Sequence, residues 1–247
     1  MSASKKRLDL VVLEKGLVHS RQRAQALIMA GKVLVNNHVV DKPGTPVFPE
    51  DDIVLQEKDH PYVSRGGLKL EKALHTLGID INGYVCLDVG ASTGGFTDCL
   101  LQHGAGRVYA VDVGYGQLAW KLRQNTRVVV IERMNIRHMQ SETLPQLVDL
   151  VTIDVSFISL RKVVPDVLKY MKKSAGILAL IKPQFEVGKE NVGKGGVVRD
   201  PVLHAQVIDN LSDFFVKKHL FCEWVIPSPI LGPKGNREFF ISLKFKS

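Results

Sequence analysis

The sequence predicts an α/β fold built on a doubly wound, largely parallel sheet, preceded by a small N-terminal α+β domain. Three observations support this. From residue 64 onward, apolar strands alternate with helical stretches. Those strands are apolar almost throughout, as is typical of strands covered on both faces. A glycine-rich turn at residues 90–95 follows the first strand and leads into a helix, an arrangement that brings backbone N–H groups close to a small ligand.

The first 58 residues are expected to form the small domain. Gly16 and Gly31 are suited to end two short helices, because each can adopt a positive φ. Ser20 is placed to cap the start of the second helix. Short strands separated by turn residues complete the unit, and they are expected at residues 32–35, 39–40 and 53–55.

A linker at residues 59–63 is expected to lead into the larger domain, residues 64–247, which opens with a helix. Further helices are expected near residues 160–172 and 201–218. The last two strands are joined by a segment rich in proline and glycine, which predicts an antiparallel pair. The seven expected strands span residues 84–88, 107–112, 128–132, 148–154, 176–182, 221–228 and 238–245.

Composition restricts the classes of partner. The net charge is +8 and the pI is about 9.4. On charge alone, this indicates either a polyanion partner or merely a basic surface. The three cysteines and eight histidines lack metal-ligand spacing, so no metal is expected. No signal peptide or membrane-spanning run is found, which predicts a cytoplasmic protein.

Acidic residues follow two neighbouring strands, where a nucleotide-like cofactor binds in such sheets. Asp112 is expected to hold a ribose diol, with Asp88 at the end of the preceding strand. The glycine order in the turn does not match the dinucleotide pattern G-x-G-x-x-G, which disfavours an NAD-dependent oxidoreductase. Tight packing is the alternative explanation of such a turn. The turn resembles motif I of S-adenosylmethionine-dependent methyltransferases, which implies that Gly90, Ser92 and Gly94 surround the methionine end of the cofactor.

Two further residues have alternative roles. Asn135 either approaches the adenine or forms a turn, and Phe157 either lines the pocket or belongs to the core. The segment 188–196, with Lys189 and Lys194, is interpreted as a mobile basic loop that either closes over RNA or is a plain surface loop.

The pattern from Ser20 to Asn36 resembles the S4-like RNA-binding domain, in which a helix, a glycine stop and a strand follow at this spacing. The resemblance implies a basic face on RNA phosphates, for which a solvated helix face is the alternative. The residues of that face are Arg7, Arg21, Arg23 and Lys32.

A lysine closes the wholly apolar strand at 176–182, where burying an ammonium without partners is costly. The alternative is that Lys182 extends to solvent. Asp154 ends another strand in the same way. Together with Lys69 and Glu238 they resemble the Lys-Asp-Lys-Glu tetrad of the FtsJ-like ribose 2′-O-methyltransferases.

Over nearly its full length the chain resembles the TlyA family, historically named hemolysins. Its matching segments begin at Ser64, Asp88, Asp112, Asp154 and Lys182. The resemblance implies a Rossmann-like methyltransferase sheet with S-adenosylmethionine as cofactor, and ribosomal RNA or ribosomal subunits as partner, methylated on a cytidine ribose. Small- and large-subunit RNA both stay open, as does the oligomeric state. The implied cofactor residues are Asp88, Gly90, Ala91, Ser92, Gly94, Gly95, Phe96, Asp112, Asn135, Asp154 and Phe157, and Arg65, Lys189 and Lys194 join the RNA-binding set.

A ribose 2′-hydroxyl must lose a proton to accept a methyl group, so one tetrad lysine is expected to act as general base. Lys182 is the candidate, with Lys69 as the neighbouring cation that favours its neutral form. Asp154 is assigned to orientation, and Glu238 to holding a lysine or the ribose. Which lysine is deprotonated stays open.

Two other classes of function compete with an RNA methyltransferase. A ribosome-binding assembly factor would keep the fold without catalysis. A membrane-lytic hemolysin is disfavoured, because the sequence has no long amphipathic cationic helix.

Overall fold

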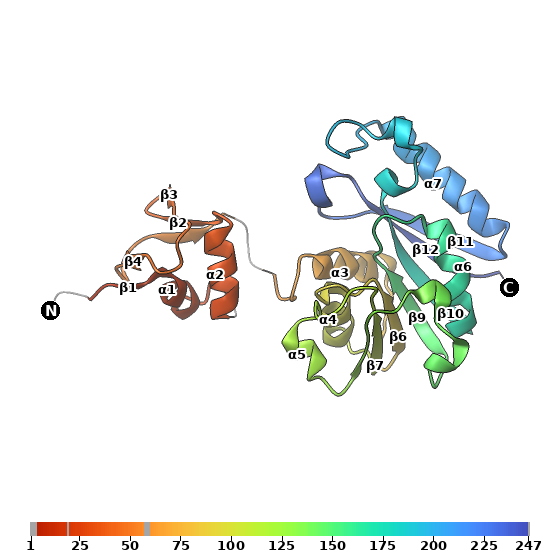
Figure 1. The fold of residues 1–247 in the computed structure, drawn as a ribbon, viewed down its shortest axis with the longest axis horizontal. Helices are drawn as coiled ribbons and strands as arrows, with labels where there is room; N and C mark the ends of the chain where they lie inside the picture. Colours follow the sequence, from red (N-terminus) through yellow and green to blue (C-terminus); the bar gives the residue numbers. More distant parts are fainter. Residues whose placement is uncertain (1–3, 19, 57–59, 247) are drawn as a thin grey trace. The chain divides into compact units, whose positions relative to one another are not determined.

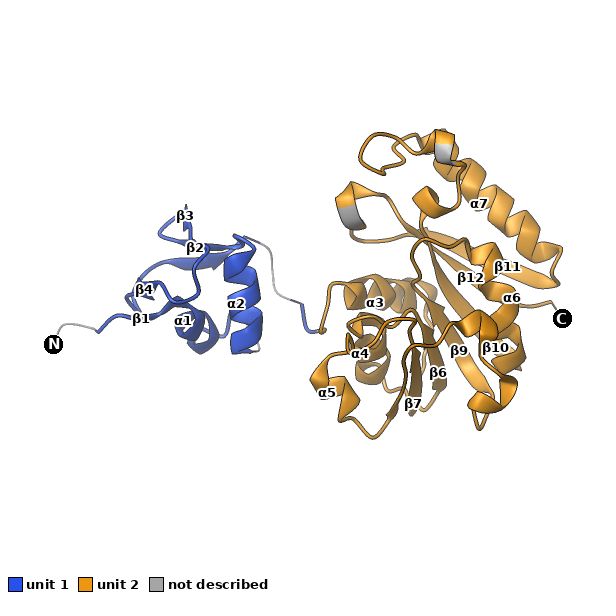
Figure 2. Cartoon of the chain, in the orientation of Figure 1, with its two compact units in different colours: residues 1–61 blue, residues 62–247 orange. Residues whose placement is uncertain are grey.

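The computed structural model describes residues 4–18, 20–56 and 60–246, without the side chains of Lys189 and Pro233. The chain divides into two compact units, residues 1–61 and 62–247 (Figure 2). Each is considered separately below. Asp59, at the start of the expected linker, lies outside the described residues.

The small unit packs two helices against short strands around one apolar core. The predicted cap is confirmed, because Ser20 Oγ accepts the N–H of Arg23 at 3.2 Å. Leu8, Val12 and Ile28 are fully buried between the elements. The elements are β1 (Lys6–Arg7), α1 (Leu8–Glu14), α2 (Arg21–Met29), β2 (Val33–Val35), β3 (His38–Val39), β4 (Pro46–Val47) and β5 (Ile53–Leu55).

The large unit is a seven-stranded sheet in the order β11-β12-β10-β9-β6-β7-β8 (Figure 1), which confirms the predicted fold class. The strands β6 to β10 run parallel, and β12 runs antiparallel to both β10 and β11. The predicted antiparallel last pair is therefore confirmed. The strands are β6 (Val85–Val89), β7 (Arg107–Val111), β8 (Val128–Ile131), β9 (Val148–Ile153), β10 (Met171–Ile181), β11 (Leu220–Pro227) and β12 (Phe239–Phe245).

Helices cover both faces of this sheet, and the strand residues alternate between them. In β10, Ile177 and Ala179 pack into one apolar cluster, while Leu178 packs into the other. The first cluster includes residues of α6 (Val164–Val167) and α7 (Pro201–Val216). The second cluster includes residues of α3 (Gly66–Leu77), α4 (Gly95–Gln102) and α5 (Trp120–Arg123).

The largest difference from the predicted boundaries lies before β10. The helical stretch expected near residues 160–172 is broken into short turns, η3 (Leu160–Lys162), α6 and η4 (Leu168–Tyr170), and β10 begins at Met171 rather than at residue 176. Met171 pairs with Val148 of β9, and the register then shifts before pairing resumes at Gly176. The residues 172–174 are exposed, so they lack the apolar pattern that would have marked them as strand.

Among the described residues, no helix is both long enough and apolar enough to cross a membrane.

Candidate active site

The loop between β6 and α4 lies at the carboxyl ends of the parallel strands, where ligands bind in such sheets. Gly90 has a φ of +85°, and any side chain there would collide with the backbone carbonyl of Asp154. Glycine is therefore required for both conformation and close approach. Ser92 also has a positive φ, and its N–H donates to Asp112 Oδ2 at 2.7 Å. The β6 loop is thus held against both neighbouring strands.

Asp88 lies behind this loop rather than in a cavity. Its carboxylate is fully buried and accepts the hydroxyls of Thr97 at 2.6 Å and Thr152 at 3.0 Å. Burial raises the pKa of Asp88 to about 6, although both threonine hydroxyls favour the charged form. The carboxylate thus ties the start of α4 to β9, and Asp88 lines neither of the cavities beside this loop.

Two cavities open beside the loop, of about 320 Å³ and 510 Å³. They share four lining residues, and at these residues a group held in one cavity would face a group held in the other. The shared residues are Gly90, Ser92, Asp154 and Ser156.

The larger cavity combines a few polar groups with mainly apolar walls. The Asp112 carboxylate is held by the N–H groups of Ser92 and Gly114, the latter at 2.7 Å. Asn135 Oδ1 accepts the N–H of Arg137 at 3.1 Å, so Asn135 both forms a turn and lines the cavity. Apolar wall residues are Met134, Ile136, Val155, Ile158 and Val163.

Phe157 is 90 % exposed and has a φ of +64°. The alternative that it is a core residue is wrong for that reason. Its ring packs against Phe185 with centroids 5.0 Å apart, and it lines the edge of the larger cavity. Backbone in this region of φ is strained for a non-glycine residue, which marks the segment after β9 as locally constrained.

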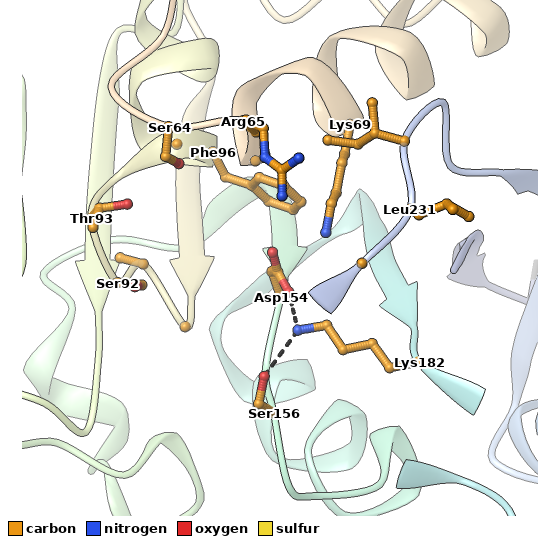
Figure 3. Close-up of a pocket in the computed structure, with 16 residues that line it drawn as sticks. Ser64, Arg65, Lys69, Ser92, Thr93, Phe96, Asp154, Ser156, Lys182 and Leu231 are labelled. Atoms are coloured by element: carbon orange, nitrogen blue, oxygen red, sulfur yellow. Dashed lines mark hydrogen bonds and ion pairs between the residues drawn. The ribbon is translucent and has the colours of Figure 1, made fainter. Parts of the chain in front are cut away.

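The smaller cavity contains a lysine–aspartate pair at the ends of β10 and β9 (Figure 3). Lys182 Nζ lies 2.5 Å from Asp154 Oδ1 and donates to Ser156 Oγ at 3.1 Å. Lys182 is only 8 % exposed, so the alternative in which it extends freely to solvent is wrong. The Lys182 ammonium is therefore held by Asp154 and Ser156, which directly follow β9.

A second lysine enters the same cavity from α3. Lys69 Nζ donates to Glu238 Oε2 at 2.6 Å, and both side chains are buried. Figure 3 shows the Lys69 ammonium pointing toward the region of Asp154. Among the described residues, Glu238 Oε1 has no hydrogen-bond partner. It lies against Gly232, which lines the cavity, whereas Glu238 itself lies behind the cavity wall. The site therefore holds two lysine–carboxylate pairs and one unused buried acceptor.

The structure brings most of the predicted cofactor residues to these cavities. Gly94 lines neither cavity and packs instead against Leu122 of α5. The residues on the larger cavity are Gly90, Ser92, Asp112, Asn135, Asp154 and Phe157, and those on the smaller cavity alone are Ala91, Gly95 and Phe96.

In the small unit, two predicted RNA-binding arginines share one buried carboxylate. Asp9 accepts Arg7 Nε and Arg21 Nε, each at 3.0 Å, and Gln25 Nε2 at 2.8 Å. The hydrogen bond from Arg7 is the main reason that the pKa of Asp9 is well below its usual range. Both arginine side chains are half-exposed.

The other predicted RNA-binding residues lie apart from that carboxylate. Arg23 bonds to His60 at 2.9 Å, and Lys32 is half-buried at the start of β2. Arg65 is exposed at the mouth of the smaller cavity. Lys194 is exposed on a turn closed by a bridge between Gly193 and Val197. The side chain of Lys189 lies outside what the structure describes.

Several contributing residues were not identified from the sequence. Ser156 holds Lys182, and its place two residues after Asp154 is the signal that could have found it. Thr97 and Thr152 hold Asp88, but a threonine in a helix or strand carries no distinctive pattern.

Comparison with known proteins supports the same division of the chain. The family profile of FtsJ-like methyltransferases matches residues 62–245, and that of the S4 domain matches residues 6–53. The chain is 45 % identical to a 16S/23S rRNA (cytidine-2′-O)-methyltransferase of Mycobacterium tuberculosis, covering 98 % of this chain and 91 % of the relative. It is 35 % identical to a 23S rRNA (cytidine-2′-O)-methyltransferase of Campylobacter jejuni, covering 95 % and 97 %.

A solved structure of a Streptococcus thermophilus protein that carries the name hemolysin is also similar. It shares 40 % identity and a TM-score of 0.78, covering 100 % of this chain and 90 % of that protein. The resemblance drawn from the sequence is confirmed by these matches.

Proposed function

The chain belongs to the FtsJ-like methyltransferase family, and from this premise we propose that it transfers a methyl group from S-adenosylmethionine to a ribose 2′-hydroxyl of a cytidine in ribosomal RNA. The observation that carries the proposal is the pair of cavities meeting at Gly90, Ser92, Asp154 and Ser156, with two lysines on one side only. The substrate class follows the printed names of the M. tuberculosis and C. jejuni relatives.

The larger cavity fits the cofactor. The Asp112 carboxylate lies beside the glycine-rich loop, where it can accept ribose hydroxyls. Apolar side chains such as Ile136 and Ile158 form a slot suited to an adenine ring, with Asn135 at its edge. S-adenosylmethionine supplies an electrophilic methyl group on a sulfonium. Gly90 and Ser92 line both cavities, which supports a position at the boundary for the methionine end.

The smaller cavity fits the acceptor nucleotide. Lys182 is the proposed base, since it lines the smaller cavity and its nitrogen contacts Asp154 and Ser156 at the boundary between the cavities, where it would take up the proton of the 2′-hydroxyl. Asp154 and Ser156 hold the Lys182 nitrogen in place, and Asp154 also offers a negative charge near the positive methyl region.

Lys69 and Glu238 form the second part of the acceptor site. Glu238 is fully buried and lines neither cavity, so its proposed role is to hold Lys69, whose side chain lines the smaller cavity. Arg65, exposed at the cavity mouth, is placed to contact a neighbouring phosphate. The two pairs thus have separate tasks, proton transfer and ribose positioning.

The small unit is proposed to bind RNA through its basic face. An S4 domain match and the paired Arg7 and Arg21 support this. Phosphate contacts of this kind hold the enzyme on its substrate without selecting the nucleotide.

The test is transfer of radiolabelled methyl groups to unmodified ribosomal RNA and to isolated ribosomal subunits. We expect label on a ribose 2′-oxygen. Lys182→Ala and Lys182→Arg are both expected to lose about 100-fold or more in rate, because general base catalysis contributes that much. Lys182→Arg keeps a cation beside Asp154 but replaces the amine that accepts the proton. A loss of rate in this variant therefore reports on proton transfer rather than on the loss of positive charge. Lys217→Ala, an exposed lysine after α7, is the matched control and should keep full activity.

Binding of S-adenosylmethionine, measured by calorimetry, is expected to survive the Lys182 substitutions. Cofactor binding without methyl transfer to any RNA form would contradict the proposal and favour a non-catalytic assembly factor. Full activity of Lys182→Arg would remove Lys182 from the role of base.

A further inference from the structure

A cluster of potential metal ligands lies outside both cavities, between α3 and α4. Glu71 and His75 come from α3, and His103 follows the last residue of α4. One ligand atom of each lies within 4.8 Å of the others. Small rotations about the side-chain bonds bring such atoms to the spacing that a single ion with bonds of about 2 Å requires.

The helix geometry explains the convergence. Glu71 and His75 are four residues apart, so they lie on the same face of α3. His103 reaches that face from the end of α4, and the two imidazole rings meet edge to face with centroids 5.9 Å apart. Because the ligands come from two helices, the spacing of histidines along the sequence does not predict the cluster.

Hydrogen bonds to neighbouring groups hold two of the three ligand side chains, His103 and Glu71, in position. His103 Nδ1 lies 2.9 Å from the carbonyl oxygen of Cys99. A carbonyl can only accept, so Nδ1 carries the proton and Nε2 keeps its lone pair for a metal. Tyr62 donates its hydroxyl to Glu71 Oε1 at 2.7 Å, which leaves Oε2 as the ligand atom. Support of this kind is typical of metal-binding histidines and carboxylates.

The charge and exposure of the cluster also suit a cation. Within the part of the chain that the structure describes, Glu71 forms no ion pair, although the protein is strongly basic. Glu71 and His103 are half-buried and His75 is exposed, so an ion can enter from solvent and keep a water ligand.

We propose that Glu71, His75 and His103 bind a divalent first-row transition ion of the zinc class, with water as the fourth ligand. Two imidazoles and one carboxylate are a common zinc ligand set. The three residues do not line the proposed cofactor or acceptor cavities, so the ion ties α3 to α4 and takes no part in methyl transfer. The proposal does not depend on the proposed function.

The test is calorimetric titration of Zn²⁺ into tag-free, chelator-treated full-length protein. We expect one ion per chain. Glu71→Gln, His75→Ala and His103→Ala should each weaken binding at least tenfold, and Tyr62→Phe should weaken it about tenfold by removing only the outer hydrogen bond. His38→Ala, an exposed histidine of the small unit, is the matched control and should bind like the wild type.

Two further readouts keep the test decisive. Co²⁺ should produce an intense visible spectrum in the wild type that is lost in His75→Ala. Zn²⁺ should raise the unfolding temperature of the wild type and of His38→Ala, but not that of His75→Ala. His75 is exposed, so its substitution leaves the core intact. Binding that persists unchanged in His75→Ala and His103→Ala, or the absence of saturable binding to the wild type, would overturn the proposal.

Discussion

Asp9 in the small unit and Asp88 in the large unit are both fully buried, yet their surroundings shift their pKa values in opposite directions. Asp9 receives two guanidinium groups and an amide, so its charged form is strongly favoured. Asp88 receives two neutral hydroxyls, which do not offset the loss of solvent, and its pKa rises to about 6. Burial alone therefore does not set the charge of a carboxylate, because its partners decide the sign of the shift.

The two carboxylates also serve different ends. Asp9 orients two half-exposed arginines of the proposed RNA-binding face. Asp88 orients no cation. It accepts hydrogen bonds from Thr97 and Thr152, and so holds the two ends of the glycine-rich loop beside β9. Four substitutions or conditions test this contrast.

The largest effect is expected from Asp88→Ala. The change leaves the hydroxyls of Thr97 and Thr152 without their buried acceptor, at about 1–3 kcal/mol each. We expect the free energy of unfolding of the large unit to fall by about 2–5 kcal/mol, with weaker cofactor binding. Both tryptophans, Trp120 and Trp224, belong to the large unit, so their fluorescence during urea unfolding reports on it. Asp209→Ala, at an exposed position of α7, is the control, and an equal loss there would show that Asp88 has no special role.

The pH dependence should differ in sign between the two carboxylates. The pKa of Asp88 is higher in the folded state, so its contribution to stability is complete below the unfolded value near 4 and is lost as pH rises through about 6, by about 3 kcal/mol in all. The pKa of Asp9 is lower in the folded state, so its contribution is complete above pH 4 and is lost only in stronger acid. Wild type and Asp88→Asn should be compared by urea unfolding from pH 4 to 7. Parallel curves would contradict the shift at Asp88.

Asp9→Asn is expected to destabilise the small unit by about 2 kcal/mol, because charge-assisted hydrogen bonds to two arginines are lost. Hydrogen exchange of the α1 and α2 amides measures this. RNA affinity should fall about threefold to tenfold, even though the net charge increases. Asp41→Asn makes the same charge change at an exposed site and should not weaken binding. Tighter RNA binding by Asp9→Asn would mean that net charge, rather than arginine orientation, determines affinity.

The smallest effect is expected from Thr152→Val, which keeps the shape of the side chain and removes one hydroxyl donor from Asp88. Stability should fall by about 1 kcal/mol. The pKa of Asp88 should rise further, so the loss of stability between pH 4 and 7 should extend to higher pH. Its midpoint is measured by the same unfolding series, and an unchanged midpoint would mean that the Thr152 hydroxyl does not favour the charged carboxylate.

Parts of the candidate site could be predicted from local pattern. The β6 loop was recognised because Gly90 lies between an apolar strand and a helix, and the strand-end positions of Asp154 and Lys182 were visible from the apolar runs before them. The pairing of the charges is predicted only in part: Glu238 is expected to hold a lysine or the ribose, and in the structure it holds Lys69. The sequence placed Lys69 beside Lys182 as a neighbouring cation, whereas the structure pairs Lys69 with Glu238 and Lys182 with Asp154.

The role of Asp88 and the ligand cluster on α3 and α4 show the same limit. Nothing in the sequence near Asp88 indicates that Thr152, sixty-four residues later, donates to it. His75 and His103 lie on different helices, and only the packing of α3 against α4 brings them together.

The sequence by itself determined the alternation of strands and helices, the glycine-rich loop, the basic charge and the residue types at the strand ends, because each depends on neighbours within a few positions. The tertiary structure alone decided which carboxylate pairs with which cation, as Asp154 does with Lys182, and which carboxylate has no cationic partner, as is the case for Asp88. That choice depends on strand order and helix packing, which join residues as distant as Lys69 and Glu238. Whether a buried group is charged depends in turn on those partners, so protonation in this protein is a property of the fold.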